Sequence, residues 1–293
     1  MNIIKLLDQF SKDDMSNDDI EIFSSRREAF KKMGSFTKKM SLAALPAAVF
    51  SAMPKIAFAQ STATPVNILN FALTLEYLEY NYYEMGVNSS VIPAETRAVF
   101  EQIRKHELAH VDFLISVIES LQGEPVQLTA ANFDFTANGA FDPFNDYQTF
   151  LTLSQAFEDT GVRAYKGQAT NVRALGDNET VNTILTAALS IHGVEARHAS
   201  LVRRLRMQKG WITGVDTSVP AAAQAVYGPG MPAAQFPAED NVVQGGVNLK
   251  DAFMGNTSLD EAAITEAFDE PLDADTATGK GTIYDIASLF IVS

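Results

Sequence analysis

The chain has 293 residues, of which 46% are hydrophobic and 20% charged, so it can bury a large core and is neither a disordered chain nor a fibre. It contains no cysteine, which excludes disulfides, cysteine-ligated zinc, iron–sulfur clusters and a thiol nucleophile. The net charge of −14 argues against nucleic acid as a partner, because a surplus of basic residues is needed to bind phosphates. No apolar run approaches the ~18–20 residues that cross a bilayer, so no integral membrane span is expected.

Residues 1–59 have the features of an export signal. They carry nine Lys and Arg against seven Asp and Glu, whereas the rest of the chain carries 13 against 29, so the net charge changes from +2 to −16. The pair Arg26-Arg27 precedes a short apolar stretch at 40–53, and Ala57-Phe58-Ala59 supplies small residues before a cleavage site. The arginine pair resembles a twin-arginine (Tat) signal, although Ala29-Phe30 replaces the usual Phe-Leu. We predict cleavage near Ala59 and a periplasmic or secreted protein; the alternative is an amphipathic N-terminal helix.

Four long helices are predicted between residues 60 and 210, because the apolar residues there recur with a helical period. Each begins at a capping residue or a proline. The starts are Thr64-Pro65, Pro93, Asp142-Pro143 and Asp177 or Asn178, and the ends are near Val87, Leu121, Gly176 and Lys209-Gly210. Short links inside the first and second pairs predict antiparallel hairpins, and the longer link at 122–142 can cross the length of a bundle. The expected fold is an all-α four-helix bundle of two such hairpins.

The composition changes after Trp211. Residues 211–293 hold 12 acidic groups against two lysines and contain Pro/Gly clusters such as Gly228-Pro229-Gly230. A capping box at Ser258 predicts a short helix to about Phe268, and an apolar helical end is expected at 283–291. We predict a mostly irregular, acidic C-terminal extension that packs on the bundle.

The seam of the bundle, followed in alternating steps of three and four residues, contains carboxylates among mostly apolar positions. The second and fourth helices each place one glutamate and one histidine three residues apart, and the first and third each place glutamate with a tyrosine seven residues later. These positions are Glu107 and His110, Glu195 and His198, Glu76 and Tyr83, and Glu158 and Tyr165, with Glu79 three residues after Glu76.

Four buried carboxylates would cost many kcal/mol unless they were protonated or paired with cations. Two divalent cations would neutralise Glu76, Glu107, Glu158 and Glu195 as a set. Residues at i and i+3 share one helix face, so each Glu–His pair can reach the same ion. A mixed imidazole and carboxylate set suits iron or manganese.

The two Glu-x-x-His motifs and their partner glutamates resemble the ferritin-like di-iron/di-manganese carboxylate superfamily. The segment Asn70–Glu79 and the long tail after the fourth helix are similar to exported ferritin-like proteins related to plant desiccation-related proteins. The resemblance implies a centre of two Fe or two Mn ions. Its ligands would be Glu76, Glu107, His110, Glu158, Glu195 and His198. Glu79 is an alternative ligand, a nearby base or a charge at the rim, while Tyr83 and Tyr165 would donate hydrogen bonds to ligand carboxylates.

The resemblance implies redox chemistry with O2, peroxide or Fe(II) in stress protection: ferroxidase, peroxidase or manganese-catalase-like activity. The residues do not choose among these, and they are compatible with a homo-oligomer. The competing hypothesis is a structural desiccation-stress protein that keeps the metal-binding bundle but catalyses nothing.

A second motif competes for the same residues. His106-Glu107-Leu108-Ala109-His110 matches the zinc metalloprotease pattern His-Glu-x-x-His, in which both histidines bind zinc and the glutamate is the general base. That interpretation leaves Glu76, Glu158 and the second Glu–His pair without a role, so we disfavour it. His106 and His192 fall off the seam and are expected to be exposed or to support a ligand.

Overall fold

The computed structural model describes residues 64–253 and 260–292, which belong to one compact unit spanning Ile56–Ser293. The predicted export signal, its cleavage site near Ala59 and the predicted cap at Ser258 lie outside the described residues. The four predicted long helices are all present. They are α4 (Pro65–Asn88), α5 (Ala94–Ser120), α6 (Tyr147–Ala174) and α7 (Glu179–Leu205).

Side-chain caps fix three of the four helix starts. The Thr64 hydroxyl accepts a hydrogen bond from Asn67 N at 3.2 Å, and Pro65 occupies the first helical position. Asn178 caps α7 through Val181 N at 3.0 Å. Helix α5 follows Pro93 and has no side-chain cap. Capping residues and proline therefore define these boundaries locally, as the sequence indicates.

Two boundaries differ from the prediction. Helix α6 begins at Tyr147 rather than at Asp142-Pro143, because Asp142 starts a separate turn and Asp146 accepts the capping bond from Thr149 N at 2.8 Å. Helix α7 ends at Leu205 rather than at 209–210. Met207 has a φ of 60°, and this left-handed residue ends the helix.

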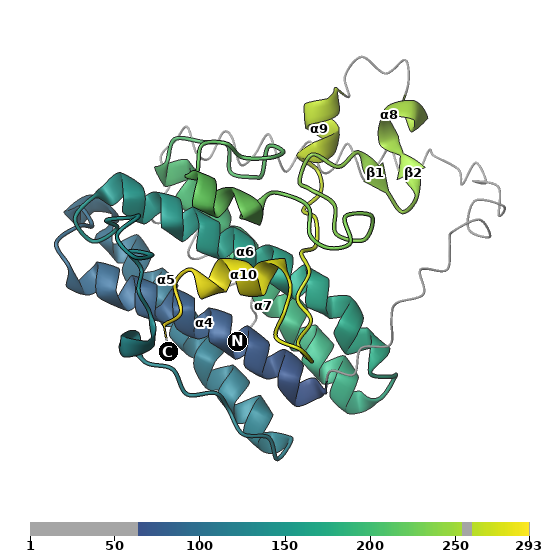
Figure 1. Ribbon diagram of the computed structural model, residues 1–293, viewed down its shortest axis with the longest axis horizontal. Helices are drawn as coiled ribbons and strands as arrows, with labels where there is room; N and C mark the ends of the chain where they lie inside the picture. The colour runs from purple at the N-terminus through teal and green to yellow at the C-terminus, as the bar shows by residue number, and fades with distance from the viewer. Residues whose placement is uncertain (1–63, 254–259, 293) are drawn as a thin grey trace, which may run out of the picture. The chain divides into compact units, whose positions relative to one another are not determined.

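The long helices form two antiparallel hairpins, α4 with α5 and α6 with α7, and α4 also packs on α6 (Figure 1). The connection from α5 to α6 runs over residues 121–146 and contains the short 3-10 helix η1 (Ala130–Asn132). The chain is thus an all-α four-helix bundle with one long crossover, as predicted. None of the described helices has the length and apolar character that a membrane crossing requires.

Aromatic rings fill one end of the bundle interior. Tyr82 stacks on Phe150 with ring centroids 5.0 Å apart and meets Phe157 edge-on at 5.0 Å, and Tyr83 stacks on Phe100 at 6.0 Å. All five rings are buried. Edge-to-face and offset contacts of this kind add to the burial of large apolar surfaces, so this end of the seam is tightly filled.

The C-terminal extension contains only short elements within its described part. They are η2 (Ala221–Val226), a hairpin of β1 (Val243–Gln244) and β2 (Val247–Asn248), α8 (Leu249–Ala252), α9 (Glu261–Thr265) and α10 (Thr282–Ser288). Helix α9 is shorter than the helix predicted to reach Phe268, and its cap is Asp260, which accepts from Ala263 N at 2.8 Å. Helix α10 ends at Ser288 and not at the predicted residue 291. Ile291 instead pairs with Phe133 of the crossover in an isolated β-bridge.

The extension is anchored to α6 by a fully buried arginine. Arg163 forms an ion pair with Glu239 at 2.9 Å and donates to carbonyl oxygens of the extension, including Glu270 O at 2.9 Å. Close by, the Gly167 position has no room for a side chain, because a Cβ there would clash with Leu272 O. Removal of one partner from a buried ion pair is strongly destabilising, so this contact holds the extension against the bundle.

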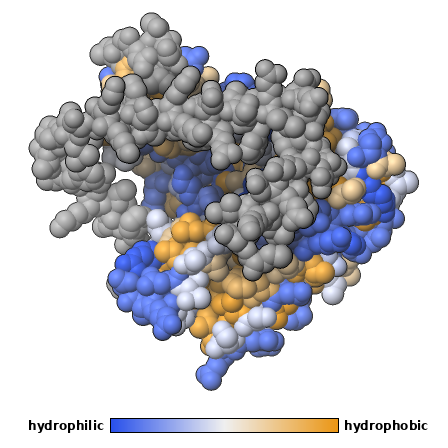
Figure 2. All heavy atoms as spheres, turned by 180° about the vertical axis from the view of Figure 1, so that it is seen from behind, coloured by the Kyte–Doolittle hydropathy of each residue, from blue (hydrophilic) through white to orange (hydrophobic). Residues whose placement is uncertain are grey.

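The surface combines hydrophilic and apolar regions. Seen from behind, the molecule shows hydrophobic side chains gathered between hydrophilic ones (Figure 2). The exposed large hydrophobic residues of α5 and α7 are Leu108, Phe113, Leu189 and Leu201. These two helices therefore leave apolar surface uncovered within the described part of the chain.

Candidate metal centre

The seam of the bundle brings together all six residues that the sequence analysis proposed as ligands. One comes from α4, one from α6, and a Glu–His pair from each of α5 and α7. The four glutamates, Glu76, Glu107, Glu158 and Glu195, are 0% exposed, and the two histidines are at most 9% exposed. Their potential ligand atoms form two groups, and within each group these atoms lie within 4.8 Å of one another.

The first group consists of Glu76, Glu107, His110 and Glu195. His110 is at its centre: its Nδ1 lies 3.0 Å from Glu76 Oε2, 2.9 Å from Glu107 Oε2 and 3.2 Å from Glu195 Oε1. Three carboxylates therefore converge on one imidazole nitrogen. We call this set the Glu76–His110 half of the centre.

The second group consists of Glu107, Glu158, Glu195 and His198. His198 Nδ1 lies 2.8 Å from Glu107 Oε1, 3.2 Å from Glu158 Oε2 and 4.0 Å from Glu195 Oε2. We call this set the Glu158–His198 half. Glu107 and Glu195 belong to both halves, and each places one oxygen near each histidine. With two ions bound, these carboxylates would be able to connect them.

Several of the potential metal-ligand atoms form no hydrogen bonds with the protein. Glu107 Oε1, Glu158 Oε2, both carboxylate oxygens of Glu195 and His198 Nδ1 are buried, and among the described residues none of them has a hydrogen-bond partner. Although His198 Nδ1 lies 2.8 Å from Glu107 Oε1, the two atoms do not have the geometry of a hydrogen bond. Buried polar atoms nearly always have partners, because an unpaired one costs about 1–3 kcal/mol. Five such atoms pointing into one small space, all of types that ligate metals, fit a cation-binding role. Carboxylate oxygen and imidazole nitrogen together suit iron or manganese.

Without a cation, protons must balance the charge of this cluster. Burial raises the pKa of Glu76 to about 7 and also raises the pKa values of Glu158 and Glu195, and neighbouring carboxylates add to the shift of Glu195. Burial opposes ionisation of Glu107 as well, but the hydrogen bond from His110 and the nearby His198 lower the pKa of Glu107 to about 2. In this state the seam holds protons where metal ions would otherwise supply positive charge.

The pKa values of His110 and His198 are raised, whereas burial ordinarily lowers the pKa of an imidazole. Burial by itself would lower their pKa values, but the charge of Glu158 and the proximity of Glu107 raise the pKa of His198 to about 11. The contacts of His110 with Glu107, Glu195 and Glu76 raise its pKa well above the usual range. The surrounding carboxylates therefore favour the protonated form of both imidazoles, and a metal ion would have to displace that proton.

Two tyrosines bond to the carboxylates that are not shared between the halves. Tyr83 donates to Glu158 Oε1 at 2.5 Å, and Tyr165 donates to Glu76 Oε1. Each hydroxyl occupies one lone pair of its carboxylate and leaves the other oxygen facing the centre. Both hydrogen bonds connect the two hairpins: Tyr83 of α4 donates to Glu158 of α6, and Tyr165 of α6 donates to Glu76 of α4.

Glu79 lies in the seam but in neither ligand group. It is 3% exposed, which contradicts its interpretation as a charge at the rim. Burial, with repulsion from Glu195, raises the pKa of Glu79 well above the usual range and so favours its neutral form. Gly161 makes room for it: a Cβ there would lie 3.2 Å from Glu79 Oε1 and 3.4 Å from Glu195 Oε2.

The motif that begins at His106 does not form the zinc site of a metalloprotease. His106 is half-buried, belongs to neither ligand group, and turns its Nδ1 to His198 Nε2 at 2.9 Å. The rings are nearly parallel, with an interplanar angle of 8°. His106 thus supports a candidate ligand on another helix, a contact that the sequence could not show. The remaining histidine, His192, contacts Val162 O at 3.1 Å instead.

Comparison with known families agrees with this geometry. Residues 64–208 match the family described as a ferritin-like domain, and the match covers all four long helices and both ligand groups. The bundle is thereby supported as a member of the ferritin-like superfamily. A search of curated proteins found no match to the chain.

Proposed function

We propose that the centre binds two Fe or two Mn ions and carries out redox chemistry on a small oxidant or on Fe(II). One observation carries the proposal: the two groups of ligand atoms share Glu107 and Glu195, and five of the donor atoms are buried without partners. Such a geometry favours two adjacent cations over one. Their four positive charges would balance the four ligand glutamates, which explains why a mostly apolar seam tolerates them.

The side chains of the chain have separable roles in this proposal. Glu76 and His110 would hold one ion, Glu158 and His198 the other, and Glu107 and Glu195 would connect them. Tyr83 and Tyr165 fix the orientation of the two unshared carboxylates. The bound ions would supply the electrons for two-electron reduction of O2 or peroxide, or accept an electron from Fe(II).

Burial and protonation complete these roles. The ligand glutamates are fully buried, so the surrounding bundle keeps bulk water away from the reacting atoms. Glu79 is a further buried acid beside Gly161, as Glu195 is, and its raised pKa favours the protonated form. This is the group we propose to exchange protons with a reduced oxidant.

Metal content and activity are measured together to test the proposal. Purified protein expressed with Fe or Mn is expected to contain about two ions per chain, and loss of both shared carboxylates in Glu107→Ala/Glu195→Ala should remove them. A matched control, Glu101→Ala/Glu119→Ala, changes two glutamates of α5 outside the centre and should keep the metal. Full metal content in the Glu107/Glu195 variant would refute the assignment.

Assays of peroxide decomposition and Fe(II) oxidation then decide among catalase-like, peroxidase and ferroxidase activity. They also separate the redox proposal from the alternative of a structural desiccation-stress protein. A protein that holds two ions yet reacts with neither O2, peroxide nor Fe(II) would favour that alternative.

We further propose that the protein is exported, in keeping with its resemblance to exported relatives of desiccation-related proteins. The support is the order of paired arginines, short apolar stretch and Ala57-Phe58-Ala59 in the sequence. Replacement of Arg26-Arg27 by Lys-Lys should leave precursor in the cytoplasm, as detected by fractionation and immunoblotting. Normal export of this variant would exclude the Tat route.

A further inference from the structure

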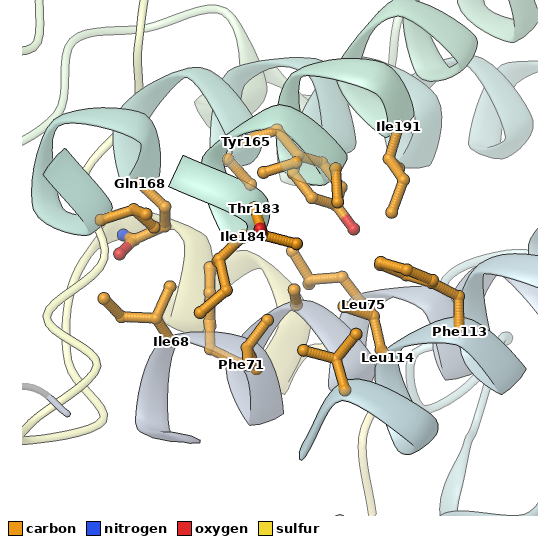
Figure 3. A pocket seen from close by; sticks show the side chains of 17 residues that line it. Ile68, Phe71, Leu75, Phe113, Leu114, Tyr165, Gln168, Thr183, Ile184 and Ile191 are labelled. Atoms are coloured by element: carbon orange, nitrogen blue, oxygen red, sulfur yellow. The ribbon is translucent and has the colours of Figure 1, made fainter. Parts of the chain in front are cut away.

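A narrow apolar cavity of about 80 Å³ runs between the four long helices (Figure 3). Aliphatic side chains such as Ile68, Leu114 and Ile184 form most of its wall. Tyr165, Gln168 and Thr183 alone among its lining residues carry polar side-chain groups. An apolar cavity of this kind stays free of water, because water would lose its hydrogen bonds there.

The cavity lies one helical turn from the metal centre. On three helices a lining residue is separated by four positions from a ligand of the Glu76–His110 half. These pairs are Ala72 with Glu76, Leu114 with His110, and Ile191 with Glu195. The fourth helix contributes Tyr165, whose ring lines the cavity and whose hydroxyl donates to Glu76. In Figure 3 this hydroxyl lies at the same end of the cavity as Ile191 and Phe113.

Beside the Glu158–His198 half, on the opposite side of the centre, the described residues leave no comparable apolar cavity along the seam. There the seam is occupied by Phe100, Ile103 and Val202, which are at most 2% exposed, and by the ring of Tyr83. The cavity therefore adjoins the Glu76–His110 half specifically.

The cavity also reaches the surface. Two of its lining residues, Phe113 on α5 and Thr183 on α7, are exposed, with Phe113 40% exposed. These helices leave apolar surface uncovered, so an apolar molecule can enter between them. The path from this mouth to the Tyr165 hydroxyl has an apolar wall for most of its length.

Size and polarity decide which molecule fits. An engineered apolar cavity of roughly 150 Å³ takes up benzene or xenon, so a cavity about half that size suits a smaller apolar molecule. Fe(II) would have to shed its hydration shell, and peroxide its hydrogen bonds, in a wall that replaces neither. Dioxygen is small, uncharged and apolar, and it loses little on leaving water.

We infer that this cavity is a dioxygen-binding site that delivers O2 to the Glu76–His110 half of the centre. The inference rests on the proposed function and deepens it, because it selects O2 among the candidate oxidants. Binding of the gas does not itself require metal, so the two proposals can be tested separately.

The first test uses metal-free protein under oxygen pressure and follows its methyl groups by NMR. Paramagnetic O2 should broaden the methyl signals of the buried cavity residues Leu114, Val172 and Ile184 far more than those of Ile103 and Val202. The last two are equally inaccessible but lie on the filled side. Equal broadening on both sides would overturn the dioxygen site whether or not the protein binds metal.

The second test fills the cavity. Ala188→Leu adds three carbon atoms to its wall and should abolish the selective broadening. It should also slow the reaction of the metal-loaded, reduced protein with O2 severalfold, while metal content is unchanged. Ala98→Leu, at an exposed alanine of α5, is the control and should match the wild type. Ala72→Val provides a milder filling should the leucine variant unfold.

An unchanged O2 rate in a filled variant that has lost the NMR signature would overturn the delivery role. If wild-type protein binds no metal, the proposed function fails, and the NMR comparison decides by itself whether the cavity binds O2.

Discussion

The two halves of the centre are built from matching residues but lie in different surroundings. Each has an unshared glutamate, a histidine from a Glu-x-x-His motif and a tyrosine donor, and both use the shared Glu107 and Glu195. The tyrosine of the Glu158–His198 half belongs to a stack of buried aromatic rings. The tyrosine of the Glu76–His110 half instead forms the wall of an apolar cavity.

The histidines differ in the same way. His198 is held from behind by His106, whose Nδ1 lies 2.9 Å from its Nε2. The hydrogen bonds of His110 to other described residues are those of its Nδ1 with Glu76 and Glu107. The Glu158–His198 half is thus supported by His106 and by packed aromatic rings, whereas the Glu76–His110 half borders a cavity. The comparison shows that a repeated ligand pattern does not imply equivalent metal positions, because the residues around it set access and support.

The largest effect is expected on metal content when the histidine of either half is replaced. His110→Ala and His198→Ala should each reduce metal content from about two ions per chain to about one, because each removes the imidazole of one half while the shared carboxylates remain. Elemental analysis gives the ratio, and circular dichroism checks folding. His192→Ala, at a half-buried histidine outside both groups, is the control and should retain both ions.

Loss of both ions in either single variant would show that the halves cannot be occupied independently. That result would contradict the separate character of the two halves, although not the existence of the centre.

An intermediate effect is expected from pH. The folded-state pKa values of Glu76 and His198 are raised, to about 7 and about 11. Each group therefore stabilises the metal-free fold fully below its unfolded pKa and loses that contribution as pH rises through the folded value. Metal ions displace these protons, so metal affinity should increase with pH across the same range.

The thermal midpoint provides the measurement for this pH effect. The increase in melting temperature on adding Mn(II) should grow from about pH 6 to about pH 8, because less competition from protons strengthens binding to the folded state. A stabilisation that shrinks as pH rises would show that protons do not compete with metal at these residues.

The smallest effect is expected from His106, and it should fall on one half only. His106→Ala removes the group behind His198, and loss of such a partner typically weakens metal binding about 10- to 100-fold. Because His106 is half-buried and water can replace it, we expect the lower end of that range. Metal titration should show one weakened and one unchanged binding step.

His106→Asn keeps a hydrogen-bonding group and should restore part of the affinity, which distinguishes support of His198 from a general packing role. Equal weakening of both binding steps would indicate a structural defect rather than support of one ligand.

The sequence by itself determined the local features of this protein. Helix starts followed from Thr64-Pro65, Pro93 and Asn178, because caps and prolines act through neighbouring backbone groups. The seam positions followed from helical periodicity, which fixes the face on which a side chain lies. For this reason the sequence could propose six ligand residues that the structure brings within reach of one another. The start of α6 was missed because two aspartates four residues apart are equally good caps.

Tertiary structure decided everything that depends on distances between helices. Whether Glu79 ligates or only borders the centre depends on the offset between α4 and its neighbours, and the contact of His106 with His198 joins residues 92 positions apart. The cavity arises because alanines and aliphatic residues of four helices meet at one level without filling it. Packing of this kind is a collective property of all four helices, so no single segment encodes it.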